Sequence, residues 1–100
     1  MGFFKDLKEQ IFGIPTDYKA LIANGAVIID VRSTQEFQSG HAKGSKNIPL
    51  QNLDAKIKQL RGKEVIVVCK SGMRAGQAKN TLTKSGISCH NAGAWQRVSF

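Results

Sequence analysis

The stretch VIVVCKSGMRAGQAK, residues 65–79, decides the fold of this 100-residue chain. It opens with four β-branched residues in a row, which favour a buried strand over residues 64–68. Gly72 breaks the pattern, and small or apolar residues then recur at helical spacing, namely Ala75, Ala78 and Leu82. The stretch therefore predicts a buried strand, a tight loop and a helix, with Cys69 where the strand ends.

Similar patterns on either side of this stretch alternate between strand and helix. Further strands are expected over residues 27–31, 46–49 and 87–90, and helices over residues 18–23 and 50–60. Strands that alternate with helices favour right-handed crossovers and a parallel sheet. We therefore expect one α/β domain over residues 1–100, with a central parallel sheet of about five strands flanked by helices on both faces.

The first thirteen residues predict an amphipathic helix. Their apolar residues fit one helical face, Phe3, Phe4, Leu7, Ile11 and Phe12. We expect this face to pack on the domain or be appended to it, and a helix on a membrane surface is the alternative. Charges interrupt any secretory signal, and no apolar run approaches the roughly 20 residues of a membrane span. The expected location is cytoplasmic.

The formal charge of +8 points to anionic ligands. The eleven lysines and four arginines are spread along the chain, without a cluster that includes aromatic residues, so no nucleic-acid partner is expected. Two cysteines are too few for a disulfide scaffold and favour a reducing compartment. Zinc requires about four ligands at paired spacings, which the chain does not offer. No metal and no cofactor are expected.

Cys69 has the surroundings of a nucleophile. It would face the amino end of the next helix, where unpaired N–H groups and the helix dipole favour the thiolate over the thiol. Lys70 and Arg74 add cations, while Ser71 and Gly72 let the loop curl so that its N–H groups form an anion nest. The alternative is a buried structural cysteine that happens to end a strand.

The spacing of the loop distinguishes between motif classes. Tyrosine phosphatases have a C-x5-R loop that fits a phosphate, whereas Cys69 and Arg74 form C-x4-R. A smaller ring favours a smaller group at the sulfur, which makes a phosphatase or arsenate reductase a less favoured reading. No stretch of the sequence matches the nucleotide P-loop motif.

Two separate motifs give the chain a resemblance to a known family. The loop Cys69-Lys70-Ser71-Gly72-Met73-Arg74 resembles the six-residue active-site loop of rhodanese-like sulfurtransferases. The upstream stretch IIDVRSTQEFQSGHAKGSKNIPL, residues 28–50, resembles the other signature of that family. The resemblance covers about residues 16–95, most of the chain.

The resemblance implies a single-domain thiosulfate sulfurtransferase. Cys69 would attack the outer sulfur of a small anionic donor such as thiosulfate, release sulfite and hold a persulfide. The loop from Lys70 to Arg74, including Met73, would bind the donor and the persulfide anion. A thiol such as thioredoxin or glutathione, or cyanide, would then accept the sulfur. The alternative is a sulfur-relay or binding module that receives a persulfide from a partner protein.

The remaining polar residues of these motifs are interpreted mainly as structural. Asp30 is expected to accept hydrogen bonds at a strand end, Arg32 and Glu36 to pair across the short turn, and His41 to tie down a loop. Each could also lie at the rim of the site. Cys89 is interpreted as a small buried residue, with a resolving thiol for Cys69 as the alternative. Trp95 is expected to cover the last turn.

Overall fold

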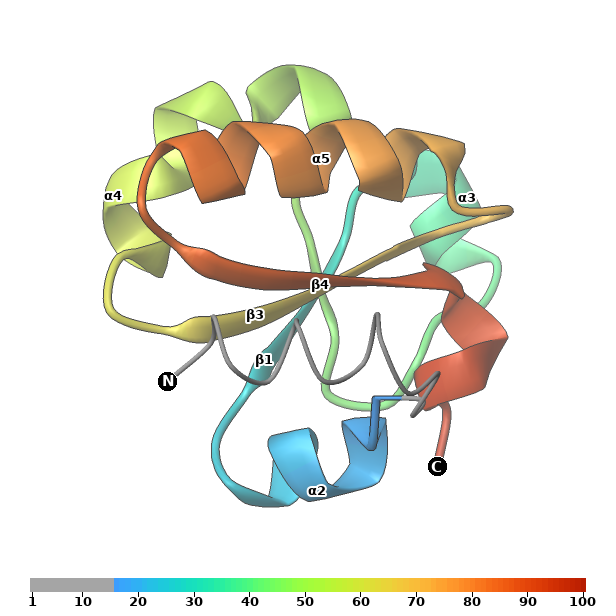
Figure 1. Ribbon diagram of the computed structural model, residues 1–100. Helices are drawn as coiled ribbons and strands as arrows, with labels where there is room; N and C mark the ends of the chain where they lie inside the picture. The colour runs from blue at the N-terminus through green and yellow to red at the C-terminus, as the bar shows by residue number, and fades with distance from the viewer. Residues whose placement is uncertain (1–15) are drawn as a thin grey trace.

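A parallel sheet with helices on both faces forms the centre of the protein. The computed structural model describes residues 16–100 (Figure 1). The strands are β1 (Val27–Asp30), β2 (Lys46–Asn47), β3 (Glu64–Cys69) and β4 (Ser88–Ala94), and their order is β2-β1-β3-β4 with every pair parallel. The predicted α/β class is confirmed, with four strands in the described part of the chain where about five were expected.

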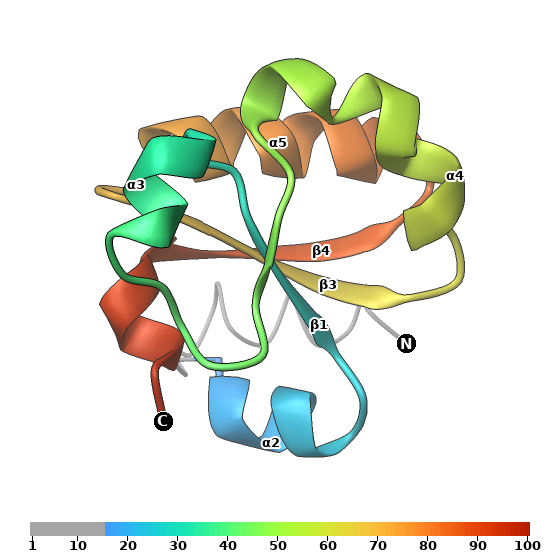
Figure 2. The same cartoon turned by 180° about the vertical axis from the view of Figure 1, so that it is seen from behind.

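The helices divide between the two faces of this sheet. Figure 2 shows α2 below the sheet and α4 and α5 above it. The helices are α2 (Tyr18–Ala23), α3 (Thr34–Gln38), α4 (Ile57–Leu60) and α5 (Met73–Lys84), joined by the short 3₁₀ helices η1 (Leu50–Asn52), η2 (Asp54–Lys56) and η3 (Trp95–Val98). Residues 50–60 were expected to form one helix, but the structure divides them between η1, η2 and α4.

Each face of the sheet has its own hydrophobic core. Val65, Val67 and Cys69 of β3 pack toward α4 and α5, whereas Ile66 and Val68 pack toward α2 and η3. Because both faces of the sheet are covered, β3 does not alternate between apolar and polar residues and instead contains consecutive β-branched residues. Burial of each such side chain contributes about 1.5–3 kcal/mol.

Two helix starts follow from their capping residues. The Asp17 carboxylate accepts a hydrogen bond from the backbone N–H of Ala20, and α2 covers the predicted residues 18–23. Ser33 and Glu36 form a reciprocal capping box at the start of α3. Local sequence therefore fixes where both helices begin.

The last strand is longer than its pattern predicts. It was expected over residues 87–90, but β4 continues to Ala94. Val67 pairs with Asn91 and Val68 with Gly93, so Ala92 is an extra residue in a β-bulge. Alanine and glycine have low β-propensity, and the extension depends instead on pairing with β3.

The carboxyl ends of β1, β3 and β4 lie at the same edge of the sheet, which is where ligands bind in open parallel sheets. Asp30 ends β1, Cys69 ends β3 and Ala94 ends β4. The expected helix over residues 1–13 lies outside the described residues. Within residues 16–100, no helix is long and apolar enough to cross a membrane.

Candidate active site

Cys69 lies at the floor of the loop that joins β3 to α5. Its side chain is almost fully buried, with 1% of the residue exposed. The backbone N–H of Gly72 donates a hydrogen bond to its Sγ over 2.8 Å. The sulfur therefore faces the loop amides, although it also touches the core under α5.

The loop curls because Gly72 adopts a left-handed conformation. Its φ is 106°, a value that side-chain-bearing residues rarely adopt, and it is the N-cap of α5. No side chain caps this helix, so its first amides are left for another acceptor. The twelve-residue α5 directs its positive end at the loop. Both features direct positive potential at the Cys69 Sγ.

Arg74 forms an ion pair with Glu36 across the site. Its two terminal nitrogens lie 2.7 and 3.1 Å from the two carboxylate oxygens of Glu36, a bidentate geometry. The pair joins α3 to the first turn of α5. Glu36 was expected to pair with Arg32, and that expectation was wrong, because Arg32 pairs with Asp30 instead.

The partner of Arg32 is Asp30, and both residues are buried. The Nε and a terminal nitrogen of Arg32 donate to the Asp30 carboxylate over 2.7–3.0 Å, and the backbone N–H of Arg32 donates to the same group. The guanidinium also donates to the Gly40 carbonyl over 2.7 Å and lies 5.1 Å from the Trp95 ring centre. Asp30 thus accepts hydrogen bonds at the strand end, as predicted.

His41 also has a structural place. Its Nδ1 lies 2.7 Å from the Phe37 carbonyl oxygen, and its ring stacks on Phe37 with a centroid distance of 3.7 Å. This contact fixes the loop after α3, as expected. The Trp95 ring lies close to Gly40, where an added Cβ would come within 3.5 Å of it.

Acid conditions should weaken the link between α3 and α5. The hydrogen bond from Arg74, together with bonds from Ser33, lowers the pKa of Glu36 from 4.5 to about 2. A lowered pKa in the folded protein stabilises it above pH 4.5, and this stabilisation is lost as pH falls toward 2. We expect the urea midpoint of Glu36→Gln to fall less than that of wild type over this window.

Arg74→Gln is the matched control, because it removes the main cause of the lowered pKa. Its pH dependence should lie between those of wild type and Glu36→Gln, because the bonds from Ser33 still lower the pKa of Glu36. If all three proteins lose stability in parallel between pH 4.5 and 2, the pair does not stabilise the fold.

The other loop residues point outward. Lys70, Ser71 and Met73 are exposed, and Met73 is 78% exposed. Lys70 places its charge at the surface next to the loop, while the charge of Arg74 is balanced by Glu36. Lys70 is therefore the more available of the two cations for an incoming anion.

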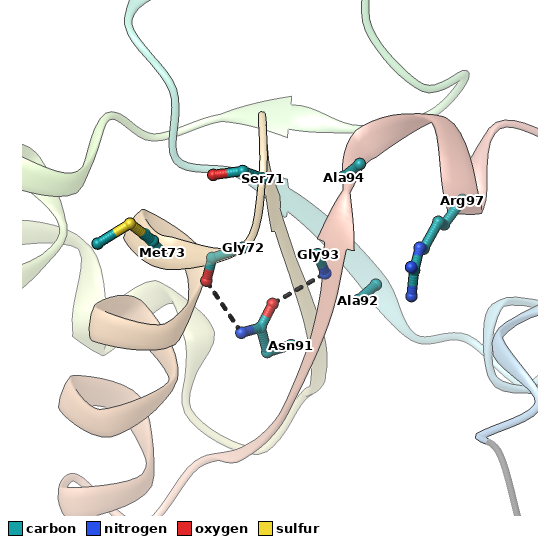
Figure 3. A pocket seen from close by; sticks show the side chains of 8 residues that line it. All are labelled: Ser71, Gly72, Met73, Asn91, Ala92, Gly93, Ala94 and Arg97. Carbon is teal, nitrogen blue, oxygen red and sulfur yellow. Dashed lines mark hydrogen bonds between the residues drawn. The ribbon is translucent and has the colours of Figure 1, made fainter.

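A pocket of about 380 Å³ lies beside the loop (Figure 3), and Cys69 is not among the residues that line it. One wall is the loop and the first turn of α5, and the other is the end of β4 with η3. Two of its polar residues, Asn91 and Arg97, were not identified from the sequence. Asn91 donates to the Gly72 carbonyl over 3.1 Å and accepts from the Gly93 N–H over 2.9 Å. Asn91 directly follows the strand expected over residues 87–90, and this position at a strand end was the available signal.

Cys89 is not placed to act on Cys69. It pairs with Val65, whereas Cys69 pairs with Ala94. Four residues of strand separate the two positions by about 13 Å at the usual rise per residue, beyond the roughly 7 Å between Cα atoms that a disulfide allows. Burial raises the pKa of the Cys89 thiol to about 12. Cys89 is a buried core residue, as interpreted, and its distance from Cys69 argues against a resolving thiol.

No group of three or more His, Cys, Asp or Glu side chains within residues 16–100 could hold a metal ion. The described site brings together one sulfur, the Gly72 amide that donates to it and the neighbouring cations Lys70 and Arg74.

Comparison with known proteins places this geometry in context. The model of the rhodanese-like domain family matches residues 14–98. The uncharacterized protein YqhL of Bacillus subtilis is 42% identical over 63% of this chain and 51% of its own length, so the chain spans about half of that relative. The thiosulfate sulfurtransferase PspE of Escherichia coli is 33% identical over 72% of this chain and 73% of its own. A solved rhodanese from E. coli, with anions, has a TM-score of 0.69 and 31% identity over 76% of this chain and 94% of its own.

Proposed function

Because the chain belongs to the rhodanese-like domain family, we propose that it is a thiosulfate sulfurtransferase that carries sulfur as a persulfide on Cys69. The observation that carries the proposal is the position of the Cys69 sulfur atom. Sγ accepts a hydrogen bond from Gly72 at the uncapped amino end of α5. The two unpaired cysteines suit a reducing compartment such as the cytoplasm.

The first half-reaction loads the sulfur. The Cys69 thiolate attacks the outer sulfur of thiosulfate, a new S–S bond forms, and the S–S bond of the donor breaks as sulfite leaves with its electron pair. The charge then moves to the outer sulfur of the persulfide. Loop amides and the positive end of α5 would stabilise that anion as an oxyanion hole does.

The second half-reaction transfers the outer sulfur from Cys69 to an acceptor. An acceptor thiolate attacks the outer sulfur, the persulfide bond breaks, and the Cys69 thiolate is restored. No external oxidant or reductant is needed, because the electrons balance within the two exchanges. A relay module would perform the same second step but would receive its sulfur from a partner protein rather than from thiosulfate.

Intact mass spectrometry after thiosulfate treatment tests the proposal. We expect one added sulfur atom on the protein, localised to Cys69, with one sulfite released per sulfur bound. Loading from a persulfide-bearing protein but not from thiosulfate would favour the relay alternative. Hydrolysis of a phosphate ester without sulfur loading would favour the phosphatase reading.

Lys70→Ala should weaken the use of thiosulfate. The exposed charge of Lys70 attracts the dianion to the loop without an evident role in the core. We expect kcat/KM for thiosulfate to fall about tenfold at low salt and the effect to shrink as salt is added.

The matched control for Lys70 is Lys63→Ala, which removes a positive charge just before β3, at the opposite edge of the sheet. It should change kcat/KM little. Equal losses in the two variants would show that overall charge, and not the position of Lys70, attracts the donor. Unfolding temperatures of both variants should match wild type.

A further inference from the structure

The pocket beside the Cys69 loop lies between two segments of the chain. Ser71, Gly72 and Met73 line one wall, and residues 91–94 with Arg97 line the other (Figure 3). Asn91 bridges the walls through its bonds to Gly72 and Gly93. A Cβ on Gly72 would lie 3.4 Å from the Gly93 Cα, so the two walls meet closely at their base. The volume of about 380 Å³ suits a small molecule.

This pocket adjoins the reactive sulfur without containing it. Cys69 is not among the lining residues, but the Gly72 amide that donates to Sγ belongs to the pocket wall. An outer persulfide sulfur would extend about 2 Å beyond Sγ. A molecule in the pocket therefore lies next to the loop that holds the sulfur it would receive.

Arg97 gives the pocket a positive charge that is available for binding. None of the residues that line the pocket is acidic. Arg32 and Arg74 are neutralised by Asp30 and Glu36, whereas Arg97 has no hydrogen bond or ion pair to another residue in the described range 16–100. A free guanidinium matches a carboxylate, which it can bind through two parallel hydrogen bonds.

We propose that this pocket binds the sulfur acceptor, and that Arg97 selects small thiols that carry a carboxylate. This inference rests on the proposed function, because it names the substrate class of the second half-reaction. With the acceptor's carboxylate bound to Arg97, its thiol group would lie toward Gly72 and the Cys69 loop. Its thiolate attacks the outer sulfur and forms a new S–S bond, while the bond between that sulfur and Cys69 breaks. The acceptor departs as a persulfide, and Cys69 is left as a thiolate.

The test separates acceptor charge from acceptor reactivity. Cys69 is first loaded with thiosulfate, excess donor is removed, and loss of the added sulfur is followed by quenched mass spectrometry. Mercaptopropionate and mercaptoethanol serve as the acceptors, with and without a carboxylate. Arg97→Gln should slow transfer to mercaptopropionate about tenfold or more, the loss expected for a charged hydrogen bond, and leave transfer to mercaptoethanol within about twofold. Loading is completed before either thiol is added, so a slower loading step in Arg97→Gln does not affect the comparison between the two thiols.

Two further variants sharpen the result. Arg97→Lys keeps the charge and should retain much of the preference for mercaptopropionate, and Lys63→Gln, at the opposite edge of the sheet, should retain all of it. Equal slowing for both thiols in Arg97→Gln, or equal effects of Arg97→Gln and Lys63→Gln, would overturn the inference while leaving the proposed function intact. Transfer to a protein thiol but to neither small thiol would also overturn it. Failure of wild type to load sulfur at all would instead remove the proposed function and this inference with it.

Discussion

Cys69→Ser is expected to reduce sulfite release from thiosulfate by a factor on the order of 1,000 or more, because it removes the sulfur that we propose as the nucleophile. A serine hydroxyl does not ionise at neutral pH and cannot hold a persulfide. The hydroxyl is close in size to the thiol and can accept the hydrogen bond that Gly72 now donates to Sγ. The variant should therefore fold normally and show no added sulfur by intact mass spectrometry.

Cys89→Ala is the matched control for this prediction. Cys89 is the other buried cysteine, but it lies opposite Val65, near the amino end of β3. Its loss should cost about 1 kcal/mol of stability and leave sulfur loading intact. Sulfur found on Cys89 in wild type, or residual turnover in Cys69→Ser above a few per cent, would contradict the assignment of Cys69 as the nucleophile.

The sequence predicted the centre of this site well because its features are local. A branched run, a thiol, a glycine and a helix pattern follow one another within fifteen residues, so chain connectivity alone brings Cys69 to the amino end of α5. The first residues of α2 and α3 were predictable for the same reason, since each N-cap side chain bonds within one turn of its helix.

The features that sequence reasoning missed depend on contacts between distant segments. Glu36 bonds Arg74, which lies 38 residues further along the chain, and a choice between Arg32 and Arg74 as partner needs the fold. The bulge at Ala92 exists because β4 pairs with β3, not because of a local preference. Arg97 becomes part of a pocket only once η3 is folded against the loop of Cys69. Residue types gave no sign of these three placements.

Arg32→Met should cause the largest loss of stability among the changes considered. Asp30 is fully buried and Arg32 is 5% exposed, so removal of the guanidinium leaves a carboxylate without its partner inside the protein. Breaking a buried ion pair in this way costs about 3–5 kcal/mol. Methionine keeps the apolar stem beside Trp95, so packing loss is small. We expect the unfolding temperature to fall by roughly 12 °C or more for a domain of this size.

A double variant separates the buried charge from the lost contacts. Asp30→Asn retains an oxygen that can accept from the backbone N–H of Arg32, a bond of 3.0 Å in the wild type. Combined with Arg32→Met it removes both charges, so the pair of changes should destabilise the protein less than Arg32→Met alone. Urea unfolding of the wild type, both single variants and the double variant completes the cycle. If the double variant loses the sum of the two single losses, the carboxylate is not the source of the cost, and Arg32 stabilises the fold mainly through Gly40 and Trp95.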